Sequence, residues 1–322
     1  MQRSSLAKFT VVVLACLIAV PASGRVGAVA QAATPCRILP SDNVWHAPVD
    51  KLRVNRRSAT YVRSIGPSSH LHPDFGSGLI DGAPFGMPIT IVRHSTPAVR
   101  IRFDYASESD RGPYRIPATA SVEGGARSTG DRHVIVVDTA TCTAYELYDA
   151  HRQRDGSWTA GSGAIFNLRS DALRPAGWTS ADAAGLPIVA GLVRYAEVAS
   201  GHIDHAIRMT VPRTDRAYLW PARHFAAPGH NAALPPMGLR LRLKRSVSLA
   251  GLPPQARVIA QALKTYGAIV ADNGSAWFIT GTQDSHWSNS QLNALKRFTG
   301  GDFEAVDESG LRIAPNSGRA RR

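Results

Sequence analysis

The sequence predicts a mainly β fold, an antiparallel β-sandwich or jelly roll covered by two or three short helices. Three observations support this class. Short segments of alternating apolar and polar residues recur along the chain. Glycine, proline and other turn-forming residues separate these segments. Only two stretches have the apolar spacing of a helix, and many short strands with few helices are typical of sandwiches and jelly rolls.

The first 32 residues have the pattern of a cleaved signal peptide. Arg3 and Lys8 precede an apolar run from Phe9 to Val20. Small residues suited to cleavage by signal peptidase follow this run. We therefore expect a secreted or extracytoplasmic protein from which residues 1–32 are removed. No later stretch reaches the roughly 20 apolar residues of a membrane span, so we expect no stable membrane insertion.

Residues 33–314 are predicted to form a single β-rich domain, because no repeat or linker divides them. The arginine-rich residues 315–322 are predicted to be a disordered basic tail. The formal net charge is +13, but only five of the 37 basic residues are lysine, which is typical of compositional bias. Because no Lys/Arg block carries interleaved aromatic residues, we expect no nucleic-acid partner. We also expect a monomer.

The cysteines predict one disulfide. Cys16 lies inside the apolar run of the signal peptide, where a lipid anchor is not expected. Its removal leaves Cys36 and Cys142, an even pair in an oxidising compartment, which is most simply a disulfide. Two free thiols remain an alternative. A metal site is not expected, since neither cysteine has a second ligand at a suitable spacing.

Strands are expected first at Pro88–Arg93 and Val99–Tyr105. In the second of these, apolar residues alternate with Arg100, Arg102 and Asp104, which indicates a half-buried strand.

The segment Asp131–Ala150, DRHVIVVDTATCTAYELYDA, predicts a β-hairpin with charged residues at its outer ends. A two-residue loop at Thr139 and Ala140 would set His133 directly opposite Glu146. A neighbouring carboxylate raises the pKa of an imidazole and orients its ring. The two residues are therefore either an acid–base pair on a solvent-accessible face or an ordinary stabilising contact between strands.

The second half of the chain continues the same pattern. Further strands are expected at Ile203–Val211, Ala217–Trp220, Gly238–Lys244, Ala268–Asp272 and Ala276–Thr280. The last two would form a hairpin around Asn273 and Gly274. Helices are expected at Gln255–Tyr266 and Ser290–Phe298, each closed by a following glycine.

Acid and base residues on a concave sheet face would suit glycosidic-bond cleavage, which needs an acid and a base or nucleophile beside the bond. Glu146 and His133 are the leading catalytic candidates. Asp131, Asp149 and His224 follow because they are acids or bases near predicted strand ends. We expect the partner to be a polysaccharide or a cell-envelope glycan.

Substrate-binding candidates come chiefly from AYLWPARH, where Trp220 could stack on a sugar ring and Arg223 could bind hydroxyls or carboxylates. Their alternative roles are a core tryptophan and a surface arginine. If the substrate is a uronic-acid polymer, Arg223 or Arg208 would neutralise the carboxylate. His133 or Tyr145 would then move the proton in a β-elimination.

Other histidines are weaker candidates. His205 shares its strand face with apolar residues, so it is predicted to be a core histidine. His70 and His72 lie close together, but no third ligand is identifiable, so no metal site is assigned. The chain has no P-loop, no dinucleotide fingerprint and no G-x-S-x-G motif, and we expect no cofactor.

Six blocks together resemble a broad group of uncharacterised secreted bacterial proteins that share them in this order. The blocks are DRHVIVVD, YELYDA, GWTSADAAGLP, AYLWPARH, PPMGLRLRLK and ALKTYGAIVADNGSAWF. The resemblance covers roughly His70 to Phe303. It implies secretion and a β-rich fold, and no established activity comes with it.

The sequence therefore supports two hypotheses. The first is an exported enzyme, a glycoside hydrolase or a polysaccharide lyase. The second is a non-catalytic glycan- or envelope-binding protein that stacks sugars on Trp158, Trp220 and Trp277.

Overall fold

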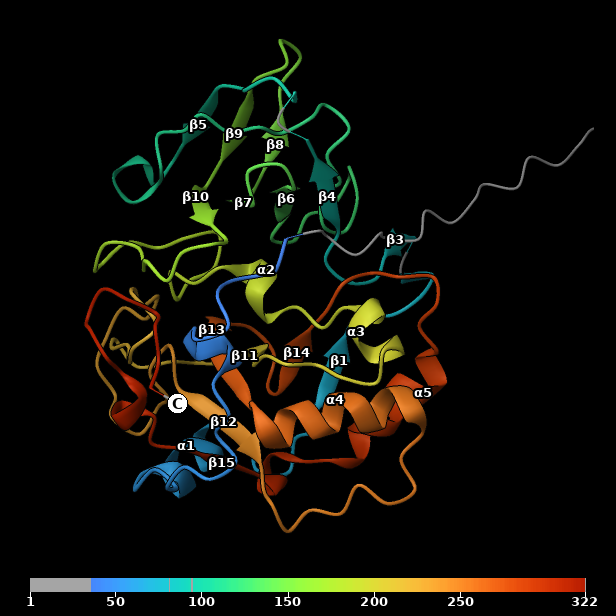
Figure 1. Cartoon of the computed structure of the whole chain (residues 1–322), viewed down its shortest axis with the longest axis vertical. Coiled ribbons are helices and arrows are strands. Elements are labelled where there is room, and N and C mark those ends of the chain that lie inside the picture. The colour runs from blue at the N-terminus through green and yellow to red at the C-terminus, as the bar shows by residue number, and fades with distance from the viewer. Residues whose placement is uncertain (1–35, 81, 94, 322) are drawn as a thin grey trace, which may run out of the picture. The chain divides into compact units, whose positions relative to one another are not determined.

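The structure is a computed structural model that describes residues 36–80, 82–93 and 95–321 (Figure 1). The predicted signal peptide, residues 1–32, lies outside these ranges. All described residues belong to one compact unit, Gln31–Arg322. Within the described ranges, no helix has the length and apolar character needed to cross a membrane.

The largest sheet has six strands in the order β1-β14-β11-β13-β12-β15. Their bounds are His72–Asp74 (β1), Phe278–Thr280 (β14), Ile207–Val211 (β11), Ala268–Asn273 (β13), Arg240–Leu243 (β12) and Phe303–Ala305 (β15). The pairs β1/β14 and β11/β13 are parallel, and the other three pairs are antiparallel. Neighbouring strands thus come from distant parts of the chain.

Helix α4, Pro254–Thr265, packs against this sheet (Figure 1). Proline suits its first turn, where the missing N–H would have no partner within the helix. Ala260 and Leu263, two residues of this helix, are fully buried. The helix is followed by Gly267 with φ +68°, where a side chain would come 2.4 Å from the backbone oxygen of Leu241. The predicted helix over Gln255–Tyr266 is therefore confirmed with its bounds shifted by one residue.

A second sheet has four strands in the order β10-β7-β6-β4. Their bounds are Ser162–Asn167 (β10), Thr143–Tyr148 (β7), Val134–Asp138 (β6) and Ile89–Val92 (β4). Every residue of β6 is buried, because both faces of the strand are covered. Ile135 and Val137 pack into the main core, whereas Val134 and Val136 pack into a second core.

The second core is completed by a three-stranded sheet in the order β5-β9-β8. Its strands are Ile101–Phe103 (β5), Trp158–Ala160 (β9) and His151–Arg152 (β8). A small two-stranded sheet pairs Leu79–Ile80 (β2) with Ala83–Pro84 (β3).

The remaining helices are short. The α-helices are Ser58–Ile65 (α1), Ile188–Gly191 (α2), Tyr195–Ala199 (α3) and Asn289–Asn293 (α5). The 3-10 helices are Val44–His46 (η1), Ala106–Glu108 (η2), Ala294–Arg297 (η3), Gly300–Asp302 (η4) and Ser309–Leu311 (η5). The helix predicted at Ser290–Phe298 is therefore divided between α5 and η3.

The strand-rich class is confirmed, since strands hold 26% of the described residues and helices 18%. The expectation of purely antiparallel sheets is wrong, because β1/β14, β11/β13, β4/β6 and β5/β9 are parallel pairs. The described residues also form five α-helices, more than the two or three expected. A sandwich or jelly roll stays a prediction, because the sheets are open.

Two predicted strand arrangements are wrong. β13 and β14 do not form a hairpin around Asn273 and Gly274, because β11 lies between them and pairs with both. Ala217–Trp220 is not a strand, and only Tyr218 forms an isolated bridge there, to Met237.

The C-terminal segment corrects a further expectation. Residues 315–321 are packed into the structure, so the prediction of a disordered tail over 315–322 is wrong for them. Arg319 forms a bridge with Asn43, and the backbone N–H of Ala320 donates to Asp42. Tail oxygens also accept hydrogen bonds from the side chains of Trp220 and Arg223. Such pairing satisfies backbone and side-chain groups that would otherwise be buried without partners.

The predicted disulfide between Cys36 and Cys142 is confirmed. It joins the first described residue to the loop between β6 and β7, across a sequence separation of 106 residues.

Candidate functional site

The β6–β7 hairpin has a longer loop than predicted, which changes its register. Asp138 pairs with Thr143, and Ile135 pairs with Glu146. The Asp138 carboxylate accepts hydrogen bonds from the N–H groups of Ala140 (2.9 Å) and Thr141 (3.3 Å), which organises the longer loop. The register moves by two residues, so each side chain keeps its face.

Glu146 is fully buried and holds two structural elements together. Its carboxylate accepts hydrogen bonds from the N–H groups of Ile188 (2.8 Å) and Val189 (2.9 Å), the first residues of α2. Burial raises the pKa of Glu146 to about 7, although these two hydrogen bonds oppose the shift. This carboxyl group therefore joins β7 to α2 and is not accessible to a polymer.

His133 is also buried, and both of its ring nitrogens have partners. Nδ1 lies 2.6 Å from Oε2 of Glu123, and Nε2 lies 3.0 Å from the backbone oxygen of Ala181. Burial lowers the pKa of His133, but the charge and hydrogen bond of Glu123 outweigh it and raise the pKa to about 9. The prediction that His133 and Glu146 are paired on a solvent-accessible face is therefore wrong.

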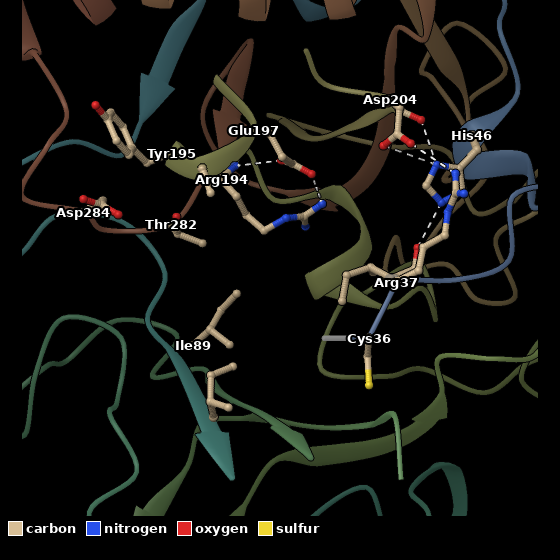
Figure 2. A pocket seen from close by; sticks show the side chains of 13 residues that line it. Cys36, Arg37, His46, Ile89, Arg194, Tyr195, Glu197, Asp204, Thr282 and Asp284 are labelled. Carbon is tan, nitrogen blue, oxygen red and sulfur yellow. Dashed lines mark hydrogen bonds and ion pairs between the residues drawn. The ribbon is translucent and has the colours of Figure 1, made fainter. Parts of the chain in front are cut away.

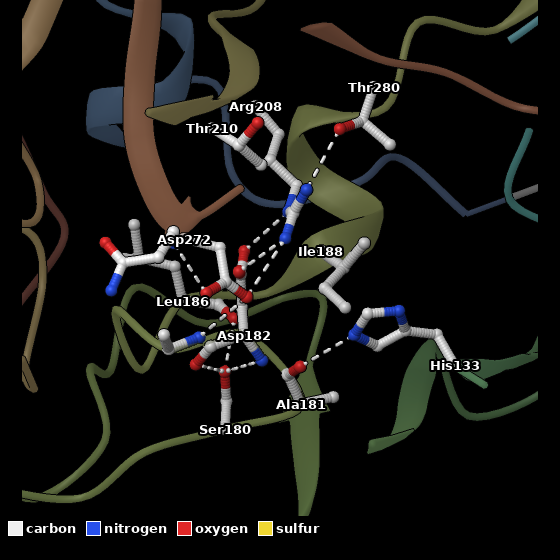
Figure 3. A network of polar contacts seen from close by, with 12 residues as sticks. His133, Ser180, Ala181, Asp182, Leu186, Ile188, Arg208, Thr210, Asp272 and Thr280 are labelled. Carbon is white, nitrogen blue, oxygen red and sulfur yellow. Dashed lines mark hydrogen bonds and ion pairs between the residues drawn. The ribbon is translucent and has the colours of Figure 1, made fainter. Parts of the chain in front are cut away.

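A buried ionic network lies next to this histidine (Figure 3). Arg208, from β11, donates to both carboxylate oxygens of Asp182, at 2.9 and 2.8 Å, and to the hydroxyl of Thr280 at 2.9 Å. It also donates to Asp272, from β13, at 3.3 Å. Such a bidentate pair fixes the orientation of the guanidinium group. Arg208 is therefore buried in the network, away from any position where it could bind substrate directly.

Asp272 differs from the rest of the network because it reaches a surface pocket. Its side chain is 23% exposed, whereas that of Asp182 is 1% exposed. Burial and the Asp182 charge raise the pKa of Asp272 to about 6, and Arg208 and His133 limit the shift. Near neutral pH, Asp272 can therefore exist in either protonation state.

The pocket beside Asp272 has a volume of about 550 Å³, and we call it the His224 pocket. Its lining comes from several separate segments of the chain. The lining residues with polar, charged or aromatic side chains are Tyr105, Glu108, Asp131, Tyr148, Ser162, Thr179, Ser180, Arg216, His224, Phe225, Asp272 and Asn273. A volume of this size is typical of ligand pockets.

His224 faces Glu108 across part of this pocket. Its Nδ1 lies 2.8 Å from the backbone oxygen of Ala183, which can only accept, so Nδ1 carries the proton. Its Nε2 lies 3.6 Å from Oε2 of Glu108 and is the nitrogen that can take up or release a proton. Oε2 of Glu108 also accepts a hydrogen bond from the N–H of Thr179 at 3.2 Å. The pocket thus holds a histidine–carboxylate pair as well as Asp272.

Aromatic and basic side chains complete the lining. Tyr105 is 57% exposed, and Phe225 stacks on His224 with ring centroids 5.5 Å apart. Arg216 is exposed and lies over the Phe225 ring, 5.4 Å from its centroid. Tyr148 reaches the pocket and lies 5.9 Å from the ring of the buried His133. Aromatic faces beside a cation suit the binding of sugar rings and anionic groups.

The predicted catalytic residues separate in space. Asp131 and His224 line the His224 pocket. His133 and Glu146 are buried and do not line it. Asp149 does not line it, and its carboxylate pairs with His151 at 2.7 Å on the surface.

The predicted substrate-binding residues do not line the pocket either. Tyr145 is buried in the second core. Arg223 is buried and donates to the backbone oxygens of Arg174 (2.7 Å) and Pro315 (2.8 Å). The Trp220 indole N–H donates to the backbone oxygen of Ser317 at 2.8 Å. Arg223 and Trp220 therefore hold the chain next to His224 in place.

Sequence reasoning missed Glu108, Tyr148, Arg216 and Asp272 as pocket residues. Asp272 and Tyr148 belong to two of the six blocks that resemble secreted bacterial proteins, but nothing in their spacing indicated a shared pocket. Glu108 lies in a short polar stretch with no motif.

A second pocket, of about 230 Å³, contains charged groups that are already paired with one another (Figure 2). Arg194 forms an ion pair with Glu197, whose carboxylate also lies 3.3 Å from Nε2 of the buried His205. Burial raises the pKa of Glu197, but Arg194 and His205 outweigh it and lower the pKa to about 2. Asp204 accepts a hydrogen bond from Arg37 at 3.1 Å. Because its charged groups are paired, this pocket is a weaker candidate for an acid–base site than the His224 pocket.

The remaining histidine predictions concern His205, His70 and His72. His205 is buried, as predicted for a core histidine. His70 forms a bridge with Thr299, and His72 stacks on Phe278 with ring centroids 4.0 Å apart. In the part of the chain that the structure describes, no group of three or more His, Cys, Asp or Glu residues could hold a metal ion.

Comparisons with family models, with curated proteins and with solved structures found no match to this chain.

Proposed function

We propose that the protein is an exported enzyme that cleaves glycosidic bonds in the His224 pocket. One observation carries the proposal: the pocket combines an aspartic acid whose pKa is about 6 with a separate histidine–carboxylate pair. Cleavage of a glycosidic bond requires an acid and a base or nucleophile, and pockets that contain shifted acid groups are candidates for such sites.

Asp272 suits the role of the general acid. Its raised pKa keeps part of the population protonated near neutral pH, so it can donate a proton to the leaving sugar oxygen. Arg208 donates a hydrogen bond to one carboxylate oxygen of Asp272 at 3.3 Å, and the N–H of Asn273 donates to the other at 2.7 Å. These two bonds fix the orientation of the Asp272 carboxyl group. Glu108, next to Nε2 of His224, would activate the attacking water or act as the nucleophile.

The same pocket also suits β-elimination in a uronic-acid polymer. Arg216 would neutralise the uronate carboxylate, replacing the buried Arg223 and Arg208 that the sequence suggested. Nε2 of His224 would remove the proton next to that carboxylate, and Asp272 would protonate the leaving oxygen. Hydrolysis adds water across the bond, whereas elimination leaves an unsaturated sugar, so product analysis separates the two reactions.

The sequence blocks that resemble secreted bacterial proteins support the choice of this pocket. Five of the six blocks supply residues to its lining: Asp131, Tyr148, Thr179, His224 and Asp272 each come from a different block. We propose that the chain belongs to that group and that the other members use the same pocket.

A non-catalytic glycan-binding protein has less support. Trp158 and Trp277 are buried, and Trp220 is partly buried with its indole N–H bonded to Ser317. These three tryptophans therefore do not form an exposed platform for stacking sugars.

Activity on a panel of plant and microbial polysaccharides tests the proposal. We expect wild-type protein to cleave at least one polymer, and Asp272→Asn and His224→Gln each to lower kcat/KM by about 100-fold or more. Asp149→Asn is the matched control, because this carboxylate lies outside the pocket. Two folded pocket variants that keep full activity would contradict the assignment.

The pH dependence gives a second readout. If protonated Asp272 is the acid, kcat/KM should fall as the pH rises through about 6, where the group loses its proton. Asp272→Asn should remove this limb from any residual activity. A profile that rises through pH 6 would mean that Asp272 acts as a base.

A further inference from the structure

A further depression on the protein surface, lined by residues other than those of the His224 pocket, is strongly basic. It is an open groove of about 960 Å³ on the three-stranded sheet, and we call it the β5–β9 groove. Three arginines line it: Arg100 and Arg102 from the β5 region, and Arg154 from the turn between β8 and β9. Asp155 is the one acidic residue in its lining.

The strand pattern explains why the arginines share one surface. Ile101 packs into the second core, so Arg100 and Arg102, one residue to either side, point away from it. The turn that carries Arg154 is closed by the N–H of Gln153, which donates to the backbone oxygen of Ser157 at 2.8 Å. All three arginines are exposed.

The arginines are available to a ligand. In the described part of the chain, none of the three guanidinium groups donates a hydrogen bond to another residue. The carboxylate of Asp155 is engaged by Ser157, whose hydroxyl donates to it at 2.6 Å and whose N–H donates at 3.0 Å. The groove thus presents three guanidinium groups without a hydrogen-bond partner among the described residues, and one carboxylate that Ser157 already engages. The charge of Arg100 also acts on this carboxylate and helps to lower its pKa, after the hydrogen bonds from Ser157.

We propose that the β5–β9 groove binds an acidic polysaccharide, one that carries uronate or sulfate groups. Arginine binds carboxylate and sulfate groups through parallel N–H donors, and a row of arginines suits a ligand with repeated anionic groups. Gln153 and Thr159 also line the groove, where Nε2 of Gln153 donates to Oγ1 of Thr159 at 3.1 Å. The amide oxygen of Gln153 and the hydroxyl proton of Thr159 can then bond to sugar hydroxyls. The choice of a glycan as the polymer rests on the proposed cleavage function, and it extends that function by naming the substrate class.

The groove and the His224 pocket are connected through one segment. Arg102 lies in the groove, whereas Tyr105, three residues later, lines the pocket. Three residues span at most about 11 Å, so one polymer chain could contact both. The groove would then hold the polymer beyond the bond that is cleaved.

Equilibrium binding without turnover tests the groove separately from the cleavage proposal. Polygalacturonate is the probe, and uncharged dextran is the reference. We expect the triple variant Arg100→Gln/Arg102→Gln/Arg154→Gln to bind polygalacturonate about tenfold more weakly, and wild-type binding to weaken as salt is added. The matched control is Arg127→Gln/Arg213→Gln/Arg245→Gln, which removes the same charge from exposed arginines outside the groove and should change affinity by less than twofold.

Several outcomes would overturn the groove assignment. Equal losses in the two triple variants would mean that only net charge matters. Dextran binding as tight as polygalacturonate binding would remove the role of anionic groups. Tighter binding of single-stranded DNA, with the same dependence on the three arginines, would assign the groove to nucleic acid. If the groove variant loses binding but no polymer is cleaved, the groove assignment holds and the cleavage proposal fails.

Discussion

The carboxylate of Glu146 shows how one buried residue can look catalytic in the sequence and be structural in the fold. It satisfies two N–H groups at the start of α2, which have no partner within the helix. Its pKa of about 7 results from burial, without a pocket that would bring a substrate to it.

Substitution of Glu146 should therefore affect stability first. We expect Glu146→Ala to lower the free energy of unfolding by about 2–4 kcal/mol, because two buried N–H groups lose their acceptor. Glu146→Gln, which keeps one acceptor oxygen, should cost less. Urea unfolding monitored by circular dichroism measures both. Asp131→Asn, an exposed acid in the pocket lining, is the control and should stay within about 0.5 kcal/mol of wild type.

At the scale of elements, the segment 315–321 supports the chain that carries His224. The side chains of Trp220 and Arg223 donate to Ser317, Pro315 and Asn316 in this segment. Arg223 also donates its backbone N–H to Ala184, next to the Ala183 oxygen that orients His224. The C-terminal segment thus stabilises one wall of the pocket.

Deletion of residues 315–322 should lower the free energy of unfolding by about 2 kcal/mol or more, since the buried Arg223 would lose two of its acceptors. Differential scanning calorimetry measures the effect. Arg319→Gln is the control, because it removes only an exposed ion pair with Asp42 and should cost less than about 1 kcal/mol. A deletion as stable as wild type would show that the segment is dispensable.

Elements with local signals could be predicted from the sequence. The 3.6-residue spacing of buried positions identified α4, and alternation identified β5 and β12. Pairing between distant segments left no local pattern, which is why the insertion of β11 between β13 and β14 was missed. The hairpin register depended on Asp138, whose side chain bonds to the loop backbone. Such side-chain bonds compete with a regular two-residue turn.

The candidate site was predicted only in part, for a similar reason. Asp131 and His224 were identified because they are acid or base residues near the ends of predicted strands. Asp272 becomes informative only through its burial and through Asp182, which lies far away in sequence; both raise its pKa. His133 and Glu146 are residue types suited to acid–base catalysis, but both are buried. Their burial depends on the segments that cover the sheet face, and the alternating pattern of one hairpin does not show which segments those are.

At the scale of the whole molecule, buried ionisable groups make stability depend on pH. Burial raises the pKa of Glu146 and Glu308 to about 7 and that of Asp272 to about 6. Their folded forms keep protons that the unfolded chain has lost, so stability should fall as pH rises from about 4.5 to 7. The pKa of His133 is raised to about 9, so its contribution to stability should be lost as the pH rises from about 6.5 to 9.

At acidic pH the dependence should reverse. The pKa of Glu197 is lowered to about 2, so its contribution is present above 4.5 and is lost as the pH falls toward 2. The melting temperature should therefore be highest near pH 5. Calorimetry from pH 3 to 9 measures the curve, and a melting temperature that rises steadily from pH 5 to 8 would contradict these pKa directions.

The disulfide should also make a large contribution to the stability of the whole molecule. It closes a loop across 106 residues, and a loop of about that length is expected to contribute about 4–5 kcal/mol through the entropy of the unfolded chain. We expect the double variant Cys36→Ser/Cys142→Ser to have a free energy of unfolding lower by this amount, and so to unfold at a lower denaturant concentration. Intact mass before and after reduction checks that the bond is present in the wild-type protein. Two alkylatable thiols in the unreduced protein would refute the prediction.

The contact of Arg319 and Ala320 with Asp42 and Asn43 has a consequence for the order in which the chain can fold. A ribosome delivers residues 42 and 43 long before residues 319 and 320, yet each pair completes the hydrogen bonds of the other. A nascent chain cannot close this junction until residues 319 and 320 have been made. Since contacts between distant residues also slow the search for the native state, this junction should form late in folding.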